Sequence, residues 1–337
     1  MIEIKKYVSS QKNEWDQFCN TSKTPMFMFN RDFMDYHKDR FFDNSLMFYD
    51  GTELIAIMPA NINRGILYSH GGLTYGGIII GVKQKQHTII DCIVSLKEYC
   101  IKNEITRVVY KCIPHIYHLQ PSEEDIYALY YHGAKLKKIE ATTVINLQKT
   151  LKMSKGRKSQ ITRAKREMVE VLELYEKEYY DLFIALENDV LYTKHQTTAV
   201  HSSEELFRLF QNFPNHIKLI GAFKDNNLIA GAVLFIYDNV IHTQYMAAND
   251  LARKIGALDL VINTIIERYK STHVWLDFGI STEENGRILN FGLIAQKEGF
   301  GGRTNIYSTW EMDFKDIQIE ACVLLTQKRN EKDYEFE

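Results

Sequence analysis

Three apolar runs follow one another closely in the second half of the chain, and the short segments between them leave few ways to fold. The runs occupy residues 217–224, 228–237 and 240–248, and the joining segments, 225–227 and 238–239, consist of Asp and Asn alone. Asp and Asn tolerate the positive φ angles that tight hairpin turns require. Because runs of this length and composition are typical of strands, the sequence predicts an antiparallel three-stranded meander.

The regions around this meander alternate between helical and extended patterns. A helix is predicted after a loop at 249–256, because apolar residues recur at helical spacing from residue 258 to residue 269. Further along the second half we expect a strand at 274–279, a helical region at 286–296 and a strand at 306–312. In the first half we expect strands at 45–49, 54–59 and 107–111 and a helix at 88–102. The predicted fold class is therefore α+β.

A basic segment separates the two halves. Residues 151–168 contain seven Lys and Arg residues and one acid, in a chain with a net charge of −2. The segment lacks Pro and has its single Gly near the start, so it is predicted to be a connecting helix. The predicted domains are 1–150, a basic helical linker at 151–180, a second domain at 181–315 and a tail at 316–337.

The charge of the linker has two interpretations. It can bind the phosphates of a cofactor or of RNA, or it can pack one face while the Lys and Arg side chains reach into water. A nucleic-acid platform requires aromatic residues between its charges, and this segment has few of them. We therefore expect no nucleic-acid partner.

Composition narrows the class of protein further. Hydrophobic residues make up 45% of the chain and charged residues 25%, as in globular proteins. The ten-residue run at 228–237 is too short to span a bilayer, and no signal-peptide pattern opens the chain. Five scattered cysteines and the spacing of His70, His115 and His118 match no common metal motif. We expect a cytoplasmic protein with reduced thiols, no membrane span and no metal.

A candidate phosphate site follows the meander. Arg253 and Lys254 precede Gly256 and Ala257 at the predicted start of a helix. Free backbone N–H groups and the positive end of the helix dipole favour a phosphate there. An ordinary helix start is the alternative interpretation.

The third strand of the meander carries a candidate general base. Attack by an amine requires a neutral nitrogen, and His242 suits removal of its proton near neutral pH. Backbone N–H groups near Met246 and Ala247 would meet the oxyanion. Asp277 ends the next predicted strand, where it can hold substrate or orient a base. Packing roles for His242 and Asp277 stay open. Regular alternation predicts one face made of His242, Gln244 and Met246 and another made of Thr243, Tyr245 and Ala247.

Five further residues are candidates for binding the substrate. His70 and Tyr75 lie in a Gly-rich stretch, SHGGLTYGG, that favours close approach of the backbone. Tyr245 stands on the predicted third strand. Asn290 and Lys297 follow Asp277, and their polar side chains can line the same cleft or face solvent.

Several strings together resemble the FemAB-type branch of the GNAT superfamily. They are GRKSQITRAKREM, HTQYMAA, WLDFG and LNFGLIAQKEGFGGR. The resemblance covers most of the chain and implies two tandem GNAT-like domains, each with a central mixed sheet, joined by the basic helix. It implies an acceptor side in the first domain, and acyl-CoA binding and catalysis in the second. The 253–258 stretch is similar to the R/Q-x-x-G-x-G/A pyrophosphate loop of GNAT enzymes, although Leu258 departs from it.

A narrower resemblance concerns the substrates. SHGGLTYGG and IPHIYHLQPSEEDIYAL resemble acyltransferases encoded with surface-polysaccharide genes. One such group is similar to N-acyltransferases that use 3-hydroxybutanoyl-CoA and dTDP-3-amino-3,6-dideoxygalactose. This implies a CoA thioester and a nucleotide-linked amino sugar as partners, and leaves the oligomeric state undetermined.

Two other functions stay open. FemAB-type relatives in cell-wall synthesis take an amino acid from aminoacyl-tRNA, and several carry a long helical hairpin. Residues 169–201 are too few for such an arm, which favours the CoA thioester. The other alternative is a nucleotide-sugar-binding or RNA-binding protein without catalysis.

Overall fold

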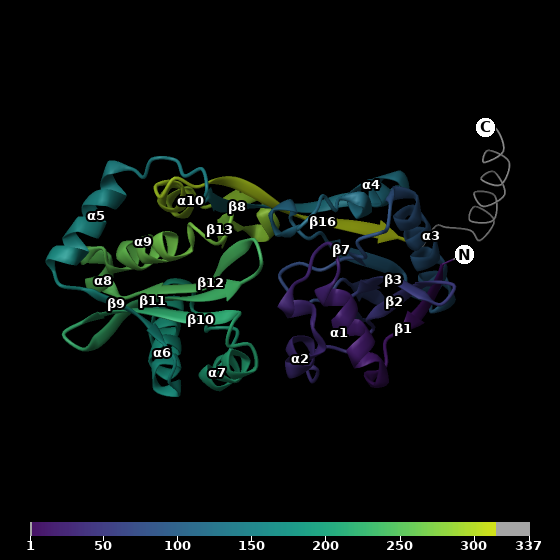
Figure 1. Cartoon of the computed structure of the whole chain (residues 1–337), viewed down its shortest axis with the longest axis horizontal. Coiled ribbons are helices and arrows are strands. Elements are labelled where there is room, and N and C mark those ends of the chain that lie inside the picture. Colours follow the sequence, from purple (N-terminus) through teal and green to yellow (C-terminus); the bar gives the residue numbers. More distant parts are fainter. Residues whose placement is uncertain (1, 315–337) are drawn as a thin grey trace.

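The computed structural model describes residues 2–314, apart from the side chains of His37, Lys194 and His195. Two lobes lie side by side along the longest axis (Figure 1). A ten-stranded mixed sheet runs through both, so the prediction of an α+β fold with mixed sheets is confirmed. In spatial order its strands are β4 (Asn61–Asn63), β5 (Ile66–Tyr68), β7 (Arg107–Lys111), β16 (Arg303–Asp313), β8 (Lys135–Asn146), β13 (Trp275–Ile280), β12 (Val240–Ala248), β11 (Asn227–Ile236), β10 (Ile217–Lys224) and β9 (Glu170–Leu174).

The first lobe adds a second, four-stranded sheet. Its order is β1 (Glu3–Lys6), β2 (Leu46–Asp50), β3 (Glu53–Met58) and β6 (Ile79–Ile80). The predicted helix at 88–102 is α3 (Gln86–Lys102), which buries Ile89, Ile93 and Leu96 in the core of this lobe. The other helices of the lobe are α1 (Lys12–Asn20), α2 (Arg31–Met34) and α4 (Glu124–Tyr131).

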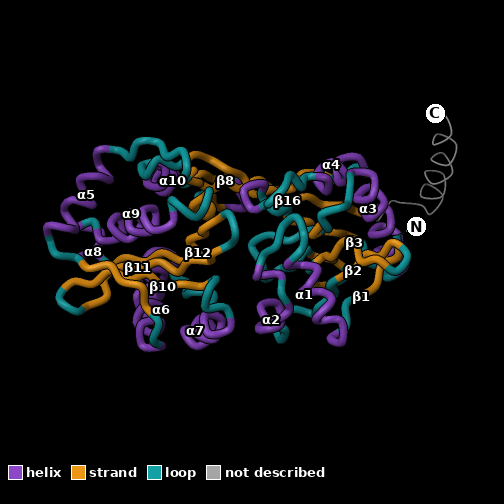
Figure 2. Tube along the Cα trace, viewed as in Figure 1, coloured by secondary structure: helices purple, strands orange, loops and turns teal. Residues whose placement is uncertain are grey.

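The second lobe contains the predicted meander. Strands β10, β11 and β12 pair antiparallel in sequence order, and Asp225 and Asn226 take positive φ in the first turn. The helices α6 (Lys177–His195) and α7 (Ser203–Asn212) cover one face of these strands. The helices α5 (Lys155–Arg166) and α9 (Ala257–Tyr269) cover the other face (Figure 2). The short helices α8 (Asp250–Ile255) and α10 (Phe291–Glu298) complete the lobe.

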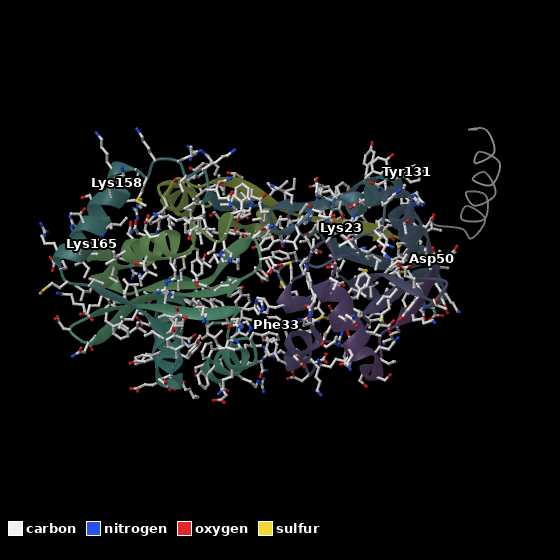
Figure 3. All side chains as sticks on the ribbon, in the orientation of Figure 1. Lys23, Phe33, Asp50, Tyr131, Lys158 and Lys165 are labelled. Carbon is white, nitrogen blue, oxygen red and sulfur yellow. The ribbon has the colours of Figure 1, made fainter. Side chains whose placement is uncertain are left out.

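Two long strands join the lobes. β8 pairs with β13 in the second lobe through its last residues and with β16 along most of its length. The far end of β16 pairs with β7 in the first lobe, for example Trp310 with Tyr110. Aromatic packing adds to this connection: Phe27 and Phe33 of the first lobe contact Phe213 and Phe235 of the second. Figure 3 labels Phe33 at this boundary. The division at residue 315 stays a prediction, and the tail at 316–337 lies outside the described residues.

The basic segment forms α5, with Ser154 as its N-cap. Its apolar side, Ile161 and Ala164, packs into the core of the second lobe beside α9. Its charged side faces solvent, and Figure 3 shows Lys158 and Lys165 pointing away from the protein.

The turn between α8 and α9 depends on Gly256. Its φ is +81°, and a Cβ at this position would lie 2.5 Å from the backbone oxygen of Gln160 in α5. Gly133 has a similar φ of +75° but open space around it. We expect Gly133→Ala to cost about 1 kcal/mol of unfolding free energy through the left-handed backbone. Gly256→Ala should cost about 1–3 kcal/mol more because it also forces α5 away. Urea unfolding measures the loss of stability in each variant. Equal losses in Gly133→Ala and Gly256→Ala would contradict the close contact of Gly256 with α5.

Membrane-spanning helices and disulfides can be assessed only for residues 2–314. None of the helices within 2–314 is long and apolar enough to cross a membrane. The cysteines in the same range, Cys19, Cys92, Cys100 and Cys112, are buried and free. Cys322 lies outside it.

Candidate active site

The strands β12 and β13 separate at the centre of the second lobe. They pair in parallel for three residues, and the last pair joins His242 with Asp277. Beyond it Gly279 takes a φ of +69°, and the register between β13 and β8 shifts. The edge of β12 that faces β13 therefore has no strand partner past His242. The part of β12 that lacks this pairing includes Met246 and Ala247, where the sequence predicts an oxyanion site.

A bulge in β12 changes which side chains share a face. The β11–β12 register shifts at Gln244, which has no partner on β11, so that two residues of β12 oppose one of β11. Tyr245 consequently packs with the cluster under α6, whereas Met246 packs with the cluster under α9. The predicted alternation is wrong beyond Thr243, and Tyr245 lies on the same face as His242.

The carboxylate of Asp277 is completely buried and accepts hydrogen bonds at both oxygens. Its Oδ1 accepts from the Thr142 hydroxyl at 2.6 Å and from the Gly279 N–H at 2.9 Å. Its Oδ2 accepts from the Tyr117 hydroxyl at 2.7 Å and from the Tyr307 hydroxyl. We call these residues, together with His242, the Asp277 network. With its oxygens occupied in this way, Asp277 is placed to orient other groups.

Burial alone would raise the pKa of Asp277, but its hydrogen bonds and the neighbouring His242 hold that pKa well below its usual range. Burial raises the pKa of Tyr117 and Tyr307 well above the ordinary value, so both phenols stay protonated and donate. The network thus holds one fixed negative charge inside the protein.

His242 is oriented by this charge. Its Nδ1 lies 3.3 Å from Asp277 Oδ2 and 3.3 Å from the Tyr117 hydroxyl. Because an ionised carboxylate only accepts hydrogen bonds, Nδ1 carries the hydrogen and Nε2 is left as the basic nitrogen. Within residues 2–314 no side chain or backbone group bonds to Nε2. The predicted pair of His242 and Asp277 is therefore brought together in a geometry that suits a general base.

Lys297 supports the same region from α10. It is buried, and its Nζ donates to the carbonyl oxygens of Gly279 at 2.9 Å and Ile280 at 2.7 Å. Burial lowers the pKa of Lys297 to about 8, against the raising effect of Asp277. These bonds hold the backbone of β13 where it leaves β12.

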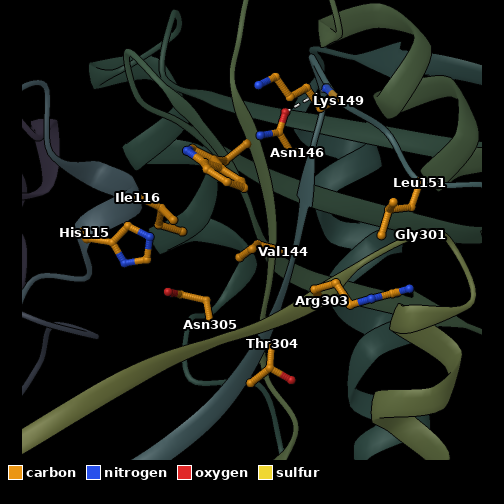
Figure 4. Close-up of a pocket in the computed structure, with 11 residues that line it drawn as sticks. His115, Ile116, Val144, Asn146, Lys149, Leu151, Gly301, Arg303, Thr304 and Asn305 are labelled. Atoms are coloured by element: carbon orange, nitrogen blue, oxygen red, sulfur yellow. Dashed lines mark hydrogen bonds between the residues drawn. The ribbon is translucent and has the colours of Figure 1, made fainter.

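A pocket of about 340 Å³ (Figure 4) is lined in part by Val144, the strand partner of Asp277 on β8. Trp275 stands two residues before Asp277 on β13, and Asn305 stands two residues before Tyr307 on β16. The amide nitrogen of Asn305 is buried and has no hydrogen-bond partner among the described residues. Arg303 and Lys149 bring positive charge, and none of the described lining residues is acidic. The lining residues are His115, Ile116, Val144, Asn146, Lys149, Leu151, Trp275, Gly301, Arg303, Thr304 and Asn305.

The other predicted substrate residues are dispersed. Tyr75 is buried and its ring lies 4.8 Å from that of Tyr117, so it packs against the network. His70 is buried in the first lobe, beside Phe41. Asn290 caps α10 by accepting from the Leu293 N–H at 2.9 Å. No group of three potential metal ligands occurs among the described residues.

The predicted phosphate loop forms two consecutive helices, α8 and α9. The Gly256 N–H donates to Ala252 O, and α5 covers the turn. Asp259 lies in the first turn of α9 and pairs with Arg157 of α5 at 2.7 Å. Lys254 is exposed on α8, and Ala257 is buried at the start of α9. The start of α9 is thus closed by protein groups.

Arg253 lies in a second pocket, also of about 340 Å³, between α6 and α8. Its guanidinium donates to Ala248 O and pairs with Asp250 at 2.5 Å. This pocket opens where β12 ends.

Sequence reasoning missed Tyr117, Tyr307 and Thr142 as partners of Asp277, and Arg303 and Asn305 as pocket residues. Tyr117 is 160 residues from Asp277 along the chain, so no local pattern joins them. The only signal was indirect, since Tyr117 lies between two of the histidines examined for metal binding.

No family model and no curated protein sequence matches this chain. The solved structure of FemX has a TM-score of 0.64 at 10% identity, covering 91% of this chain and 96% of that chain. L-PGS from Bacillus licheniformis has a TM-score of 0.56 at 11% identity, covering 85% and 88%. A tandem GNAT protein from the clavulanic acid biosynthesis pathway has a TM-score of 0.51 at 11% identity, covering 93% and 98%.

The fold is therefore a tandem GNAT-like fold of the FemX type. At these identities the likeness is one of fold alone.

Proposed function

We propose that the protein transfers an acyl group from a thioester to an amine, with His242 as the general base. The observation that carries this proposal is the buried Asp277–His242 pair at the point where β12 and β13 separate. A fixed carboxylate behind Nδ1 makes Nε2 a proton acceptor, and the open edge of β12 offers backbone N–H groups beside it.

In the proposed reaction His242 Nε2 takes a proton from the attacking amine. The amine nitrogen bonds to the thioester carbon, and the oxyanion forms against backbone N–H groups near Met246 and Ala247. The C–S bond then breaks, the thiolate leaves and takes up a proton, and an amide remains. Asp277 keeps its charge throughout and stabilises the imidazolium, as carboxylates do behind catalytic histidines.

The acceptor we propose is an amine on a nucleotide-linked sugar, in line with the sequence resemblance to enzymes that use dTDP-3-amino-3,6-dideoxygalactose. The pocket shown in Figure 4 has the chemistry for such a ligand. Trp275 offers a ring for stacking, Arg303 and Lys149 offer charge for phosphates, and the free amide of Asn305 offers a donor. In this assignment the segment around His115 is the contribution of the first lobe.

The donor we propose is a CoA thioester, with 3-hydroxybutanoyl-CoA as the first candidate. Its phosphates would meet Arg253 and Lys254 on the α8 side, because the Gly256 turn is covered by α5. Calorimetry with acetyl-CoA and 3-hydroxybutanoyl-CoA tests this assignment. If neither thioester binds, the donor assignment is wrong.

The covered start of α9 favours one second candidate, transfer from an aminoacyl-tRNA. The exposed cations of α5, Lys155, Lys158, Lys165 and Arg166, would then contact RNA. Binding of tRNA should weaken steeply with salt, and Lys158→Gln with Lys165→Gln should flatten that dependence. Binding that ignores salt would remove this candidate.

A charge-removing variant tests the acceptor pocket. We expect Arg303→Gln to raise the KM for the nucleotide sugar about tenfold to a hundredfold, because a charge-assisted contact to phosphate is lost. The KM for the thioester should not change. Arg287→Gln is the matched control, since Arg287 is exposed outside the pocket. A release assay for the free thiol measures both variants, and equal KM values in both would exclude this pocket as the phosphate site.

A further inference from the structure

Glu187 is a buried carboxyl group whose Oε2 has no hydrogen-bond partner among the described residues. It lies on α6, which packs against β12, and only 7% of its surface is exposed. Its Oε2 accepts no hydrogen bond and no cation pairs with it within the described part of the chain. Burial raises the pKa of Glu187 to about 7, with no charge that offsets the effect. Buried polar groups are nearly always satisfied, so an exception of this kind requires an explanation.

Glu187 interacts electrostatically with Tyr245 on β12. Burial raises the pKa of the neighbouring Tyr245, and the nearby Glu187 raises it further. The Tyr245 hydroxyl is hydrogen-bonded to His201 Nδ1, and His201 Nε2 lies 2.5 Å from the Tyr36 hydroxyl. Burial lowers the pKa of His201 to about 4, so this histidine is neutral near pH 7. The nearby Arg40 is engaged in an ion pair with Glu205.

The bulge at Gln244 connects this region to the proposed active site. It puts Tyr245 next to His242 on one face of β12, and α6 covers that face. Glu187 therefore belongs to the helix that covers the side of β12 carrying the proposed base.

We propose that Glu187 and the Tyr245 hydroxyl form a binding site for the primary ammonium group of the acceptor. An ammonium group has three hydrogens to donate and no acceptor, which matches a free carboxylate oxygen beside a phenol oxygen. This inference rests on the proposed function for the identity of the ligand, because it holds the acceptor amine before His242 removes its proton. Glu187 is a binding residue in this scheme, and His242 stays the base.

The site is tested with methylammonium as the probe and methanol as a neutral probe of similar size. Saturation-transfer NMR on the full chain should detect methylammonium, at much higher signal than methanol, in the wild type and in Glu178→Gln. Glu178 is an exposed glutamate on the same helix and serves as the matched control. Glu187→Gln keeps the shape of the side chain and removes the charge, so it should lose the methylammonium signal. Equal signals in all three proteins would overturn the proposal.

Kinetics provide a second arm. Glu187→Gln should raise the KM for the amino acceptor about tenfold to a hundredfold and leave kcat within a few-fold. If Glu187→Gln raised only the KM for an aminoacyl donor, the assignment of Glu187 to the acceptor would be wrong. Because methylammonium binding needs no turnover, a failure of the proposed acyl transfer is distinguished from a failure of this site.

Discussion

Replacing His242 with Gln is expected to slow acyl transfer by about a hundredfold to ten-thousandfold, the usual contribution of a general base. Gln has no nitrogen that accepts a proton near neutral pH, so the variant lacks a base. The loss should appear in kcat, with little change in the affinity for the thioester. Release of the free thiol, followed with saturating thioester and amine, measures it.

The control for this variant is His87→Gln. His87 is exposed on α3 in the first lobe, away from the Asp277 network. Its replacement should leave turnover at the wild-type value, and thermal unfolding should show that both variants are folded. Wild-type turnover in His242→Gln would remove His242 as the base while leaving the fold intact.

Asp277→Asn is expected to have an effect of similar size on turnover, by another route. The amide has an NH₂ group where Oδ1 or Oδ2 accepts, so at least one of the donors Thr142, Tyr117, Tyr307 or Gly279 loses its acceptor. The fixed charge behind His242 also disappears, and the tautomer with a basic Nε2 is no longer favoured. We expect a loss of about a thousandfold to ten-thousandfold in kcat.

The same variant tests stability. A buried group that loses its partner costs about 1–3 kcal/mol of unfolding free energy. The folded pKa of Asp277 lies below its ordinary value of 3.8. Its contribution to stability is therefore complete above that value and is lost as the pH falls through the folded pKa. Asp277→Asn should unfold more easily near neutral pH, and its difference from wild type should shrink in acid. A constant difference from neutral pH down to acid would contradict a carboxylate that is ionised in the folded state.

Much of the second lobe could be predicted from local patterns. The strands of the meander occur almost where the turns at 225–227 and 238–239 require them, and Ser202 and Glu205 form a capping box at the start of α7. These features depend on residues that are close together in the sequence, so local patterns predict them. The proposed pair of His242 and Asp277 was found because each residue stands on a strand with a clear pattern.

Other features escaped prediction for physical reasons. The first part of β8 is rich in Lys and alternates weakly, and it is a strand because β16 pairs with it. The bulge at Gln244 has no signal in the sequence, yet it decides that Tyr245 faces the same way as His242. The Gly256 motif matches the pattern of a phosphate loop in part, but α5, almost a hundred residues earlier, covers it.

The sequence by itself determined the α+β class, the meander and the strand positions of the proposed base His242 and of Asp277. These depend on local periodicity and turn chemistry. The tertiary structure alone decided what surrounds them. It brought Tyr117 from the first lobe and Tyr307 from the last strand onto one oxygen of Asp277, and it left Oε2 of the buried Glu187 without a hydrogen-bond partner among the described residues. Contacts between residues so far apart form only when the two lobes pack on a shared sheet, and a single sequence carries no local sign of them.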